Sequence, residues 1–345
     1  MELDDALRTQ VEQATGARAG AAPIKKLKGD ASNRSYYRVG EPPRSWVVMV
    51  MPPDASKKSE EATKGDAPAE LPFVNVHRYL DRLKVRVPAI LRYDEPAGMM
   101  VLEDLGDVTF EMALEGGKRR EELYGRAVEL LARLRARAEQ ERDPACLAFT
   151  RAFDEDLYDW ELHHFREWGL EAWSGKKPTP AERAELDRHF RQIARRLAEE
   201  PRGFTHRDYQ SRNIMVKDGD LVVIDFQDAL MGPRQYDLVA LLRDSYVELD
   251  WAFVDRMLDR YLAAFQRETG EKIDPAPFKD FFDLLTVQRK LKDAGRFEFI
   301  NRVKGNPGFL VSIPASLRYV QSALGRRSEL SAMREIVARY VPEVG

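Results

Sequence analysis

Hydrophobic and polar positions in the first hundred residues predict mainly strands. After an opening helix over residues 4–15, aromatic and β-branched residues on both sides of a turn near residues 29–33 predict strand, loop and strand. Residues 46–51 form an apolar run of the buried-strand type, and two more strands, over residues 89–93 and 99–102, flank a turn. One helix, beginning near Pro72, is predicted between these strands.

From Gly106 onward, apolar residues recur at helical spacing. Two helix faces are defined by Leu123, Leu130, Leu131 and Leu134, and by Leu186, Phe190, Ile193 and Leu197. The single exception is residues 213–226, where a Lys-Asp-Gly-Asp turn between two apolar runs predicts a hairpin. The pattern therefore predicts an α+β fold with two lobes: a small β-rich N-terminal lobe over residues 1–103 and a larger, mainly helical C-terminal lobe over residues 104–345.

Composition narrows the class of protein. The chain has 345 residues, 43% of them hydrophobic, which is enough for a large core. A net charge of −3 gives no electrostatic reason to expect a nucleic-acid partner, and the single cysteine excludes an internal disulfide. No segment has the ~18 consecutive apolar residues of a membrane span, and the N-terminus does not resemble a secretory signal. We expect a cytoplasmic monomer without a membrane partner.

Two polar segments are interpreted as surface. Residues 52–70 carry Pro, Lys, Glu, Ala and Ser with nothing to bury, which predicts a flexible connection. The arginines at positions 133, 135 and 137 are interpreted as the solvated face of a helix.

The segment THRDYQSRN, residues 205–213, has the spacing of the protein-kinase catalytic loop. In that pattern the aspartate, here Asp208, accepts the proton of the attacking hydroxyl, and the asparagine, here Asn213, binds a metal ion. Asp225 stands at the end of the predicted hairpin, where a carboxylate would coordinate Mg²⁺ bridging the phosphates of ATP. We therefore predict an ATP-dependent phosphotransferase with Asp208 and His206 as catalytic residues and Asn213 and Asp225 as Mg²⁺ ligands.

Two N-terminal segments are candidates for binding ATP. Residues 29–35 are small and polar, so backbone N–H groups can approach the phosphates, and Arg34 or Arg38 could add positive charge. Residues 102–106 join the predicted lobes, where an extended backbone could hydrogen-bond the adenine edge. A plain hairpin turn and an ordinary linker are the alternative interpretations. The residues assigned to the nucleotide are Gly29, Ser32, Asn33, Arg34, Glu103, Asp104 and Leu105.

Together these motifs resemble the aminoglycoside phosphotransferase / choline kinase-like superfamily, which shares the two-lobed protein-kinase fold. The resemblance covers GDASNRSYYR, VLEDLGD, HRDYQSRNIMV and IDFQDALMGPRQYDLVALLRD. Within the superfamily, the chain resembles bacterial sugar kinases that phosphorylate N-acetylmuramate and N-acetylglucosamine at the anomeric hydroxyl in cell-wall recycling, and the segment QRKLK, residues 288–292, is similar to theirs. The resemblance implies a sugar-like substrate, a structural role for Asp237 in holding the catalytic loop, and positions for Gln227 and Asp228 in the sugar pocket.

The sequence departs from the usual kinase pattern at the lysine that binds the phosphates, so an inactive relative is also possible. Most kinases hold the α- and β-phosphates with a strand lysine, and Met49 or Met51 stands at that position here. Arg34, Arg38 or a lysine within residues 57–64 would have to replace it. A nucleotide-binding pseudokinase that acts as a scaffold is therefore an alternative, although an inactive site has no need for the complete catalytic set. Only eleven residues separate Asp225 from Asp237, which leaves little room for a peptide substrate.

The sequence leaves the acceptor molecule open. An anionic sugar requires a cation, and the basic run at positions 289, 290, 292 and 296 could provide one, whereas a cationic aminoglycoside requires an acidic pocket, to which Glu161 could contribute. Each of these charges is also compatible with a solvated helix face. An aminoglycoside kinase, or a kinase of another small molecule, remains the alternative. The residues assigned to the substrate are Gln227, Asp228, Glu161 and Arg207.

Overall fold

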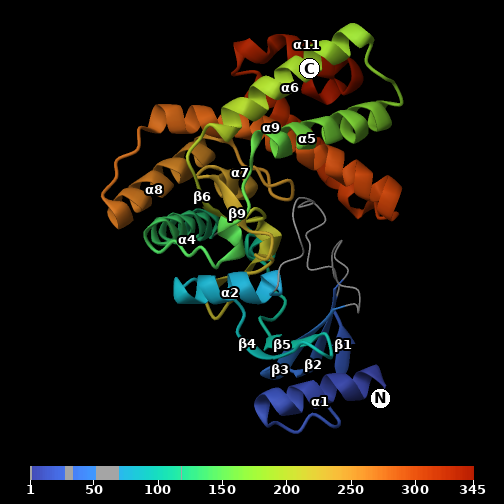
Figure 1. Cartoon of the computed structure of the whole chain (residues 1–345), viewed down its shortest axis with the longest axis vertical. Helices are drawn as coiled ribbons and strands as arrows, with labels where there is room; N and C mark the ends of the chain where they lie inside the picture. Colours follow the sequence, from blue (N-terminus) through green and yellow to red (C-terminus); the bar gives the residue numbers. More distant parts are fainter. Residues whose placement is uncertain (1, 28–33, 52–69, 118) are drawn as a thin grey trace. The chain divides into compact units, whose positions relative to one another are not determined.

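The computed structural model describes residues 2–27, 34–51, 70–117 and 119–345 (Figure 1). Two compact units make up the chain: one comprises Met1–Ala113 and Ile214–Ile224, and the other comprises Leu114–Asn213 and Asp225–Gly345. The predicted turn at residues 29–33 and nearly all of the predicted connection at residues 52–70 lie outside the described residues.

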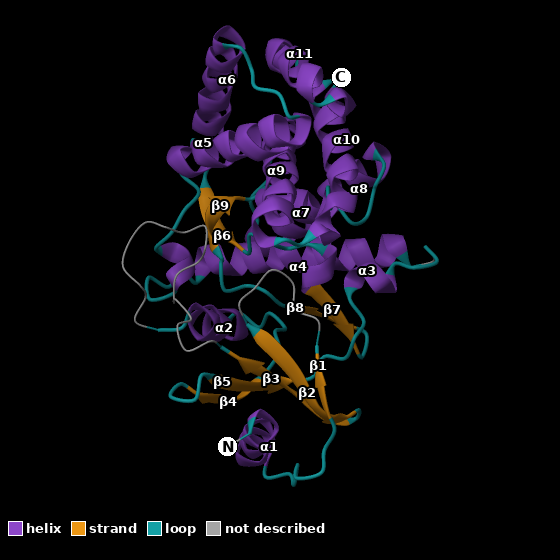
Figure 2. Ribbon diagram, turned by 90° about the vertical axis from the view of Figure 1, so that its right-hand side faces the viewer, coloured by secondary structure: helices purple, strands orange, loops and turns teal. Residues whose placement is uncertain are grey.

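The first unit is built on a five-stranded antiparallel sheet with strand order β1-β2-β3-β5-β4. Its strands are β1 (Ile24–Lys26), β2 (Ser35–Glu41), β3 (Arg44–Val50), β4 (Ile90–Asp94) and β5 (Met99–Glu103). Helices α1 (Leu3–Thr15) and α2 (Pro72–Arg82) lie on opposite faces of this sheet (Figures 1 and 2). The unit also contains α3 (Phe110–Ala113) and the hairpin of β7 (Ile214–Lys217) and β8 (Asp220–Val223). The helices and strands predicted in this part of the sequence are confirmed.

Strand register decides which side chains of β3 enter the core beneath α1. Val48 of β3 packs in one buried cluster with Leu7 and Val11 of α1. Met49 is also fully buried, and because successive side chains of a strand alternate between faces, it lies on the opposite face of the sheet. Met49 pairs with Tyr36 of β2 on one side and with Met100 of β5 on the other. The strand position at which most kinases have a lysine is therefore occupied by the buried thioether of Met49.

The second unit is mainly helical, as predicted. Its helices are α4 (Arg120–Gln140), α5 (Glu155–His164), α6 (Pro180–Ala198), α7 (Tyr236–Leu242), α8 (Trp251–Thr269), α9 (Pro275–Lys304), α10 (Ile313–Leu324) and α11 (Ser331–Tyr340). Helix α5 continues into a π-helical segment, Phe165–Ala172, and short 3₁₀ turns occur at Leu147–Phe149, Ser211–Asn213, Pro307–Ser312, Ser328–Leu330 and Pro342–Val344. Gly270 and Gly305 follow α8 and α9 in the left-handed conformation, which ends each helix. None of the helices in the described part of the chain is long and apolar enough to cross a membrane.

Two features of the second unit contradict the sequence prediction. The hairpin was predicted to be the only strand pair beyond residue 106, but β6 (Arg202–Thr205) also pairs antiparallel with β9 (Leu230–Pro233). The predicted solvated arginine face is wrong for Arg135, which is only 4% exposed. Its guanidinium donates to the carbonyl oxygens of Phe204 (3.2 Å) and Gly232 (2.9 Å), so α4 supports this strand pair.

Candidate active site

Strand β6 leads directly into the predicted catalytic loop, residues 206–213. Asp237, near the start of α7, accepts hydrogen bonds from the backbone N–H groups of His206 (2.7 Å) and Arg207 (2.9 Å). The Asp237 carboxyl is buried, and burial raises its pKa, while the two backbone donors act in the opposite direction. These hydrogen bonds confirm that Asp237 holds the catalytic loop.

Asp208 is held from two sides. The Nδ1 atom of the buried His206 accepts a hydrogen bond from the backbone N–H of Asp208 (3.2 Å). On the side-chain end, Nη2 of Arg289 lies 3.4 Å from Oδ1 of Asp208. The Asp208 side chain is nevertheless 34% exposed, so a substrate hydroxyl can reach its carboxylate.

Asn213 and Asp225, the predicted metal ligands, lie next to each other. Nδ2 of Asn213 donates to the backbone carbonyl of Asp208 (2.9 Å) and lies 3.5 Å from Oδ2 of Asp225. Because the amide nitrogen makes these contacts, the Asn213 side-chain oxygen is left to coordinate a metal ion. Gln227 donates through Nε2 to the other carboxylate oxygen of Asp225 (2.8 Å), which orients that side chain.

This pair of side chains fits Mg²⁺. The ion prefers oxygen ligands and usually takes only one or two from the protein, with the others coming from water and substrate phosphates. Among the described residues, no group of three or more His, Cys, Asp and Glu side chains is placed to hold a metal ion. The donor set at Asn213 and Asp225 is thus suited to a metal ion that arrives with a phosphorylated substrate.

Two of the four non-glycine residues with positive φ in the described part of the chain lie at this site. Arg207 has φ +81° and Asp225 has φ +63°, both in the left-handed region that residues with a Cβ seldom adopt. Such conformations persist only where neighbouring contacts enforce them, and they are common at functional sites. At Arg207 the enforcing contacts are visible, because its N–H is held by Asp237 and its carbonyl oxygen by Arg289 (2.8 Å).

The residues assigned to the substrate lie in different environments. Gln227 contacts the predicted metal ligand Asp225, and Asp228 is half-buried, 4.0 Å from the Nη1 atom of Arg151. The side chains of Glu161 and Arg207 are both buried. Glu161 accepts a hydrogen bond from Gln288 of α9 (2.6 Å), while the Arg207 guanidinium lies over the ring of Phe153.

The residues assigned to the nucleotide belong to the first unit. Gly29, Ser32 and Asn33 lie outside the described residues, and Arg34 immediately precedes β2. Glu103, the last residue of β5, and Asp104 after it are both contacted by a lysine. Lys217 of β7 donates to Oε1 of Glu103 (3.0 Å) and to the backbone carbonyl of Asp104 (2.7 Å).

Arg38, one of the predicted phosphate-binding cations, is fully engaged within its own unit, and the candidate lysines within residues 57–64 lie outside the described residues. The Arg38 guanidinium donates to both oxygens of Asp104 (2.7 and 2.9 Å) and to Asp107 (3.0 Å). These two carboxylates raise the pKa of Arg38 further above its usual range, and the side chain is 8% exposed. Arg38 therefore joins β2 to the segment after β5.

The basic run on α9 is not a solvated face. Arg289, Lys290 and Lys292 are 0%, 2% and 8% exposed, so the interpretation of these charges as surface is wrong. Lys290 pairs instead with Asp293 (2.7 Å) and contacts Ser245. Consecutive residues of a helix point in directions about 100° apart. As a result, positions 288, 289 and 290 contact α5, the catalytic loop and the segment after α7, respectively.

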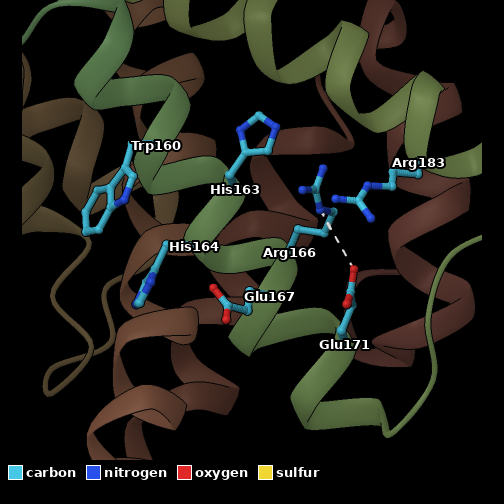
Figure 3. A pocket seen from close by; sticks show the side chains of 7 residues that line it. All are labelled: Trp160, His163, His164, Arg166, Glu167, Glu171 and Arg183. Atoms are coloured by element: carbon cyan, nitrogen blue, oxygen red, sulfur yellow. Dashed lines mark ion pairs between the residues drawn. The ribbon is translucent and has the colours of Figure 1, made fainter.

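A separate pocket of about 400 Å³ opens beside α5, the π-helical segment and α6 (Figure 3). Its lining residues are Trp160, His163, His164, Arg166, Glu167, Glu171 and Arg183. The guanidinium groups of Arg166 and Arg183 point toward each other in Figure 3, and Arg166 is already paired with Asp187 and lies 3.8 Å from Glu171. None of the predicted catalytic or metal-binding residues lines this pocket, so we do not assign it to the active site.

Removing the Asp237 carboxylate is expected to destabilise the second unit. In Asp237→Ala, the buried N–H groups of His206 and Arg207 lose their acceptor, and each unsatisfied group costs about 1–3 kcal/mol. We expect the free energy of unfolding, measured by chemical denaturation, to fall by about 3 kcal/mol. The control is Asp250→Ala, which removes an exposed cap that accepts one N–H from Phe253, and it should cost about 1 kcal/mol. Equal losses in the two variants would contradict the role given to Asp237.

Comparison with known proteins identifies the family of the chain. The family model described as "Phosphotransferase enzyme family" matches residues 23–275. The chain is 36% identical over 321 residues to an N-acetylmuramate/N-acetylglucosamine kinase from Pseudomonas aeruginosa, with 92% of this chain and 88% of that protein covered. It is 30% identical over 319 residues to a kinase of the same name from Neisseria meningitidis serogroup B, with 90% of this chain and 89% of that protein covered.

Solved structures show the same fold. A choline kinase from Streptococcus pneumoniae superposes with a TM-score of 0.61 at 13% identity, covering 94% of this chain and 99% of that one. An ADP-bound aminoglycoside phosphotransferase superposes with a TM-score of 0.59 at 14% identity, covering 93% of this chain and 98% of that one. The predicted kinase-like α+β fold is confirmed. On the match of the family model and these relatives, the chain belongs to the phosphotransferase enzyme family and is a small-molecule kinase.

Proposed function

We propose that this kinase transfers the γ-phosphoryl group of ATP to the anomeric hydroxyl of an N-acetylated amino sugar such as N-acetylmuramate or N-acetylglucosamine. The observation that carries the proposal is the hydrogen-bonded cluster of Asp208, Asn213 and Asp225. The cluster occurs in a chain that matches kinases named for these two sugars over about nine-tenths of its length. The use of ATP favours a cytoplasmic location.

Each member of the cluster has a role in this reaction. Asp208 accepts the proton of the sugar hydroxyl as its oxygen forms a bond to the γ-phosphorus, while the bond from that phosphorus to the β–γ bridging oxygen breaks and ADP leaves. Asn213 and Asp225 would hold Mg²⁺ through their side-chain oxygens. A bound Mg²⁺ neutralises charge on the β- and γ-phosphates. Gln227 keeps the Asp225 carboxylate in one orientation.

Arg34 is our candidate for the cation that replaces the strand lysine. Met49 is uncharged and buried, and the charge of Arg38 is balanced by Asp104 and Asp107. Side chains alternate along an extended segment, which gives Arg34 the same sheet face as Arg38 and Met49. Ser35 pairs with Val50, the last residue of β3, and Arg34 comes one residue before Ser35. Arg34 therefore follows the sheet at the end of β3.

Arg34→Gln is expected to raise the KM for ATP by about tenfold, because losing one phosphate contact of ~1.4 kcal/mol changes affinity tenfold. Arg34→Lys should recover part of this loss, and the KM for the sugar should not change. The controls are Arg44→Gln at an exposed position of β3, with no expected effect, and Arg38→Gln, which should lower the melting temperature. Steady-state kinetics at varied concentrations of ATP and of the sugar measure both KM values. A native KM for ATP in Arg34→Gln would exclude this assignment.

A panel of acceptors tests the substrate. ATP consumption is measured with N-acetylmuramate, N-acetylglucosamine, the corresponding sugars without the N-acetyl group, and kanamycin-type aminoglycosides, and ³¹P NMR identifies the phosphorylated position. Phosphorylation at C1 of the N-acetylated sugars is the expected result. Turnover of aminoglycosides alone would refute the sugar assignment, and no turnover of any acceptor would favour a pseudokinase.

A further inference from the structure

Arg289 is a fully buried arginine on α9 whose charge points into the catalytic loop. Its Nη1 donates to the carbonyl oxygen of Arg207 (2.8 Å), and its Nη2 lies 3.4 Å from Oδ1 of Asp208. The guanidinium also lies over the ring of Tyr236 of α7, 4.7 Å from its centroid. Arg289 is 81 residues away from Asp208 along the chain, so this contact joins two distant segments of the sequence.

We propose that Arg289 is a positioning residue for phosphoryl transfer, which holds the Asp208 carboxylate by Oδ1 so that Oδ2 faces the acceptor hydroxyl. This inference rests on the proposed function, in which Asp208 is the general base. Arg289 does not itself contact the reacting atoms. It acts on the reaction only through the orientation of Asp208 and of the peptide that precedes it.

The chemistry of the guanidinium suits this task. Arginine carries a rigid planar fork of N–H donors, so one side chain can bind a backbone carbonyl and a carboxylate at fixed relative positions. A lysine ammonium is a point charge on a flexible stem, and it would satisfy the two acceptors less well. The acceptor carbonyl belongs to Arg207, whose φ of +81° places it in a strained conformation. Holding that carbonyl fixes the peptide that leads into Asp208.

The cost of burying this charge argues for a specific role. An uncompensated buried charge is strongly unfavourable, and Arg289 has the carboxylates of Asp208, Asp237 and Asp293 near it. Burial lowers the pKa of the Arg289 guanidinium, but Tyr236 and these carboxylates raise it by more, so the pKa lies above its usual value and the group remains charged. A hydrophobic residue of similar size would fill the same space without this requirement. The charge is therefore explained by what it contacts, namely the catalytic loop.

A purely structural arginine is the competing explanation, and the chain offers a matched control for it. Arg243, at the end of α7, is 1% exposed, lies 3.5 Å above the ring of Trp251 and reaches the carbonyl oxygen of Leu249 at 3.4 Å. It is as buried as Arg289 and lies in the same unit, but it contacts Trp251, Phe282, Tyr319 and Leu249 and not the catalytic loop. Replacing either arginine removes a buried cation, whereas only one replacement releases Asp208.

The experiment compares Arg289→Gln, Arg289→Lys and Arg243→Gln in the full-length protein, with ATP and the acceptor that gives the highest native turnover. We expect Arg289→Gln to lower kcat by roughly 10²-fold, the size of effect that a displaced catalytic group produces, with both KM values within about threefold of native. Arg289→Lys should regain about tenfold of the lost kcat. Arg243→Gln should lower the melting temperature but leave kcat within about threefold of native.

A double variant separates this inference from the base assignment. If Arg289 acts through Asp208, adding Arg289→Gln to Asp208→Asn should not reduce the residual rate further. A further 10²-fold loss in the double variant, or a kcat of Arg289→Gln within about threefold of native, would overturn the inference. Native turnover in Asp208→Asn would instead overturn the proposed function. If Arg289→Gln does not fold, Arg289→Lys carries the test: an unchanged kcat in that variant would also overturn the inference.

Discussion

Asp208→Asn is expected to lower kcat by roughly 10³-fold while the protein remains folded. The amide has nearly the same shape as the carboxylate but cannot accept the proton of the sugar hydroxyl, and general base catalysis contributes about 10²–10⁴-fold. The backbone of Asp208 makes the hydrogen bonds to His206 and Asn213, so these contacts persist in the variant. The KM for ATP should therefore stay near its native value. ADP release in a coupled assay measures both quantities.

The control for this variant is Asp250→Asn at the N-cap of α8, because asparagine caps a helix as well as aspartate does. Its kcat and melting temperature should equal those of the native protein. If Asp208→Asn turns over at the native rate, Asp208 is not the base. If neither the native protein nor the variant consumes ATP with any acceptor, the chain is a scaffold that retains a kinase-like site.

Asp225→Asn is expected to have an effect of similar size through the metal ion. Neutralising this ligand weakens the binding of Mg²⁺, and Lewis-acid stabilisation of a transferring phosphoryl group amounts to several kcal/mol. A loss of about 4 kcal/mol corresponds to a decrease of roughly 10³-fold in kcat/KM. The variant should also require a higher Mg²⁺ concentration for half-maximal rate, because one negative charge is missing at the site. A titration of the rate with Mg²⁺ at saturating ATP measures this shift.

The dependence on Mg²⁺ distinguishes a metal effect from loss of structure. EDTA should abolish native turnover, and excess Mg²⁺ should restore it completely. Asp225→Asn should retain the native melting temperature in EDTA, where neither protein carries the ion. A variant with lower kcat but the native Mg²⁺ requirement would show that Asp225 acts by some means other than metal binding.

The parts of the fold that the sequence predicted are those in which local pattern and tertiary environment agree. The hairpin around residues 218–219 has a strong turn signal between two apolar runs, and α6 carries a regular apolar face that is buried as expected. Strands β6 and β9 were missed because each has four residues, and their sequences RGFT and LMGP contain glycine or proline. They are strands because they pair with each other across 24 intervening residues, a contact that no local window reveals.

The catalytic loop was predictable because its residues are close in sequence and their spacing is specific. Arg289 was not connected to it, because the contact joins residues far apart in the chain. The basic run on α9 was interpreted from charge alone, as a surface or a site for an anion. A better signal precedes it: the residues Phe281, Phe282, Leu284, Leu285 and Val287 cover more than half of the helix circumference, so the apolar face is unusually wide. A helix with so wide an apolar face is largely buried, and charged residues within it must be paired.

The left-handed backbone at Arg207 and Asp225 affects which substitutions would be found if this enzyme were selected for heat resistance. A non-glycine residue in this conformation lowers the free energy of unfolding by roughly 1–3 kcal/mol. Glycine adopts the conformation without this strain, so a substitution by glycine would remove the loss. Random libraries screened only for survival at high temperature will therefore favour these two positions. One of the two carries a predicted metal ligand, and the other forms the peptide that orients Asp208. Substitutions at these two positions that raise the melting temperature are therefore expected to lower kcat. Selection for stability should be combined with selection for activity.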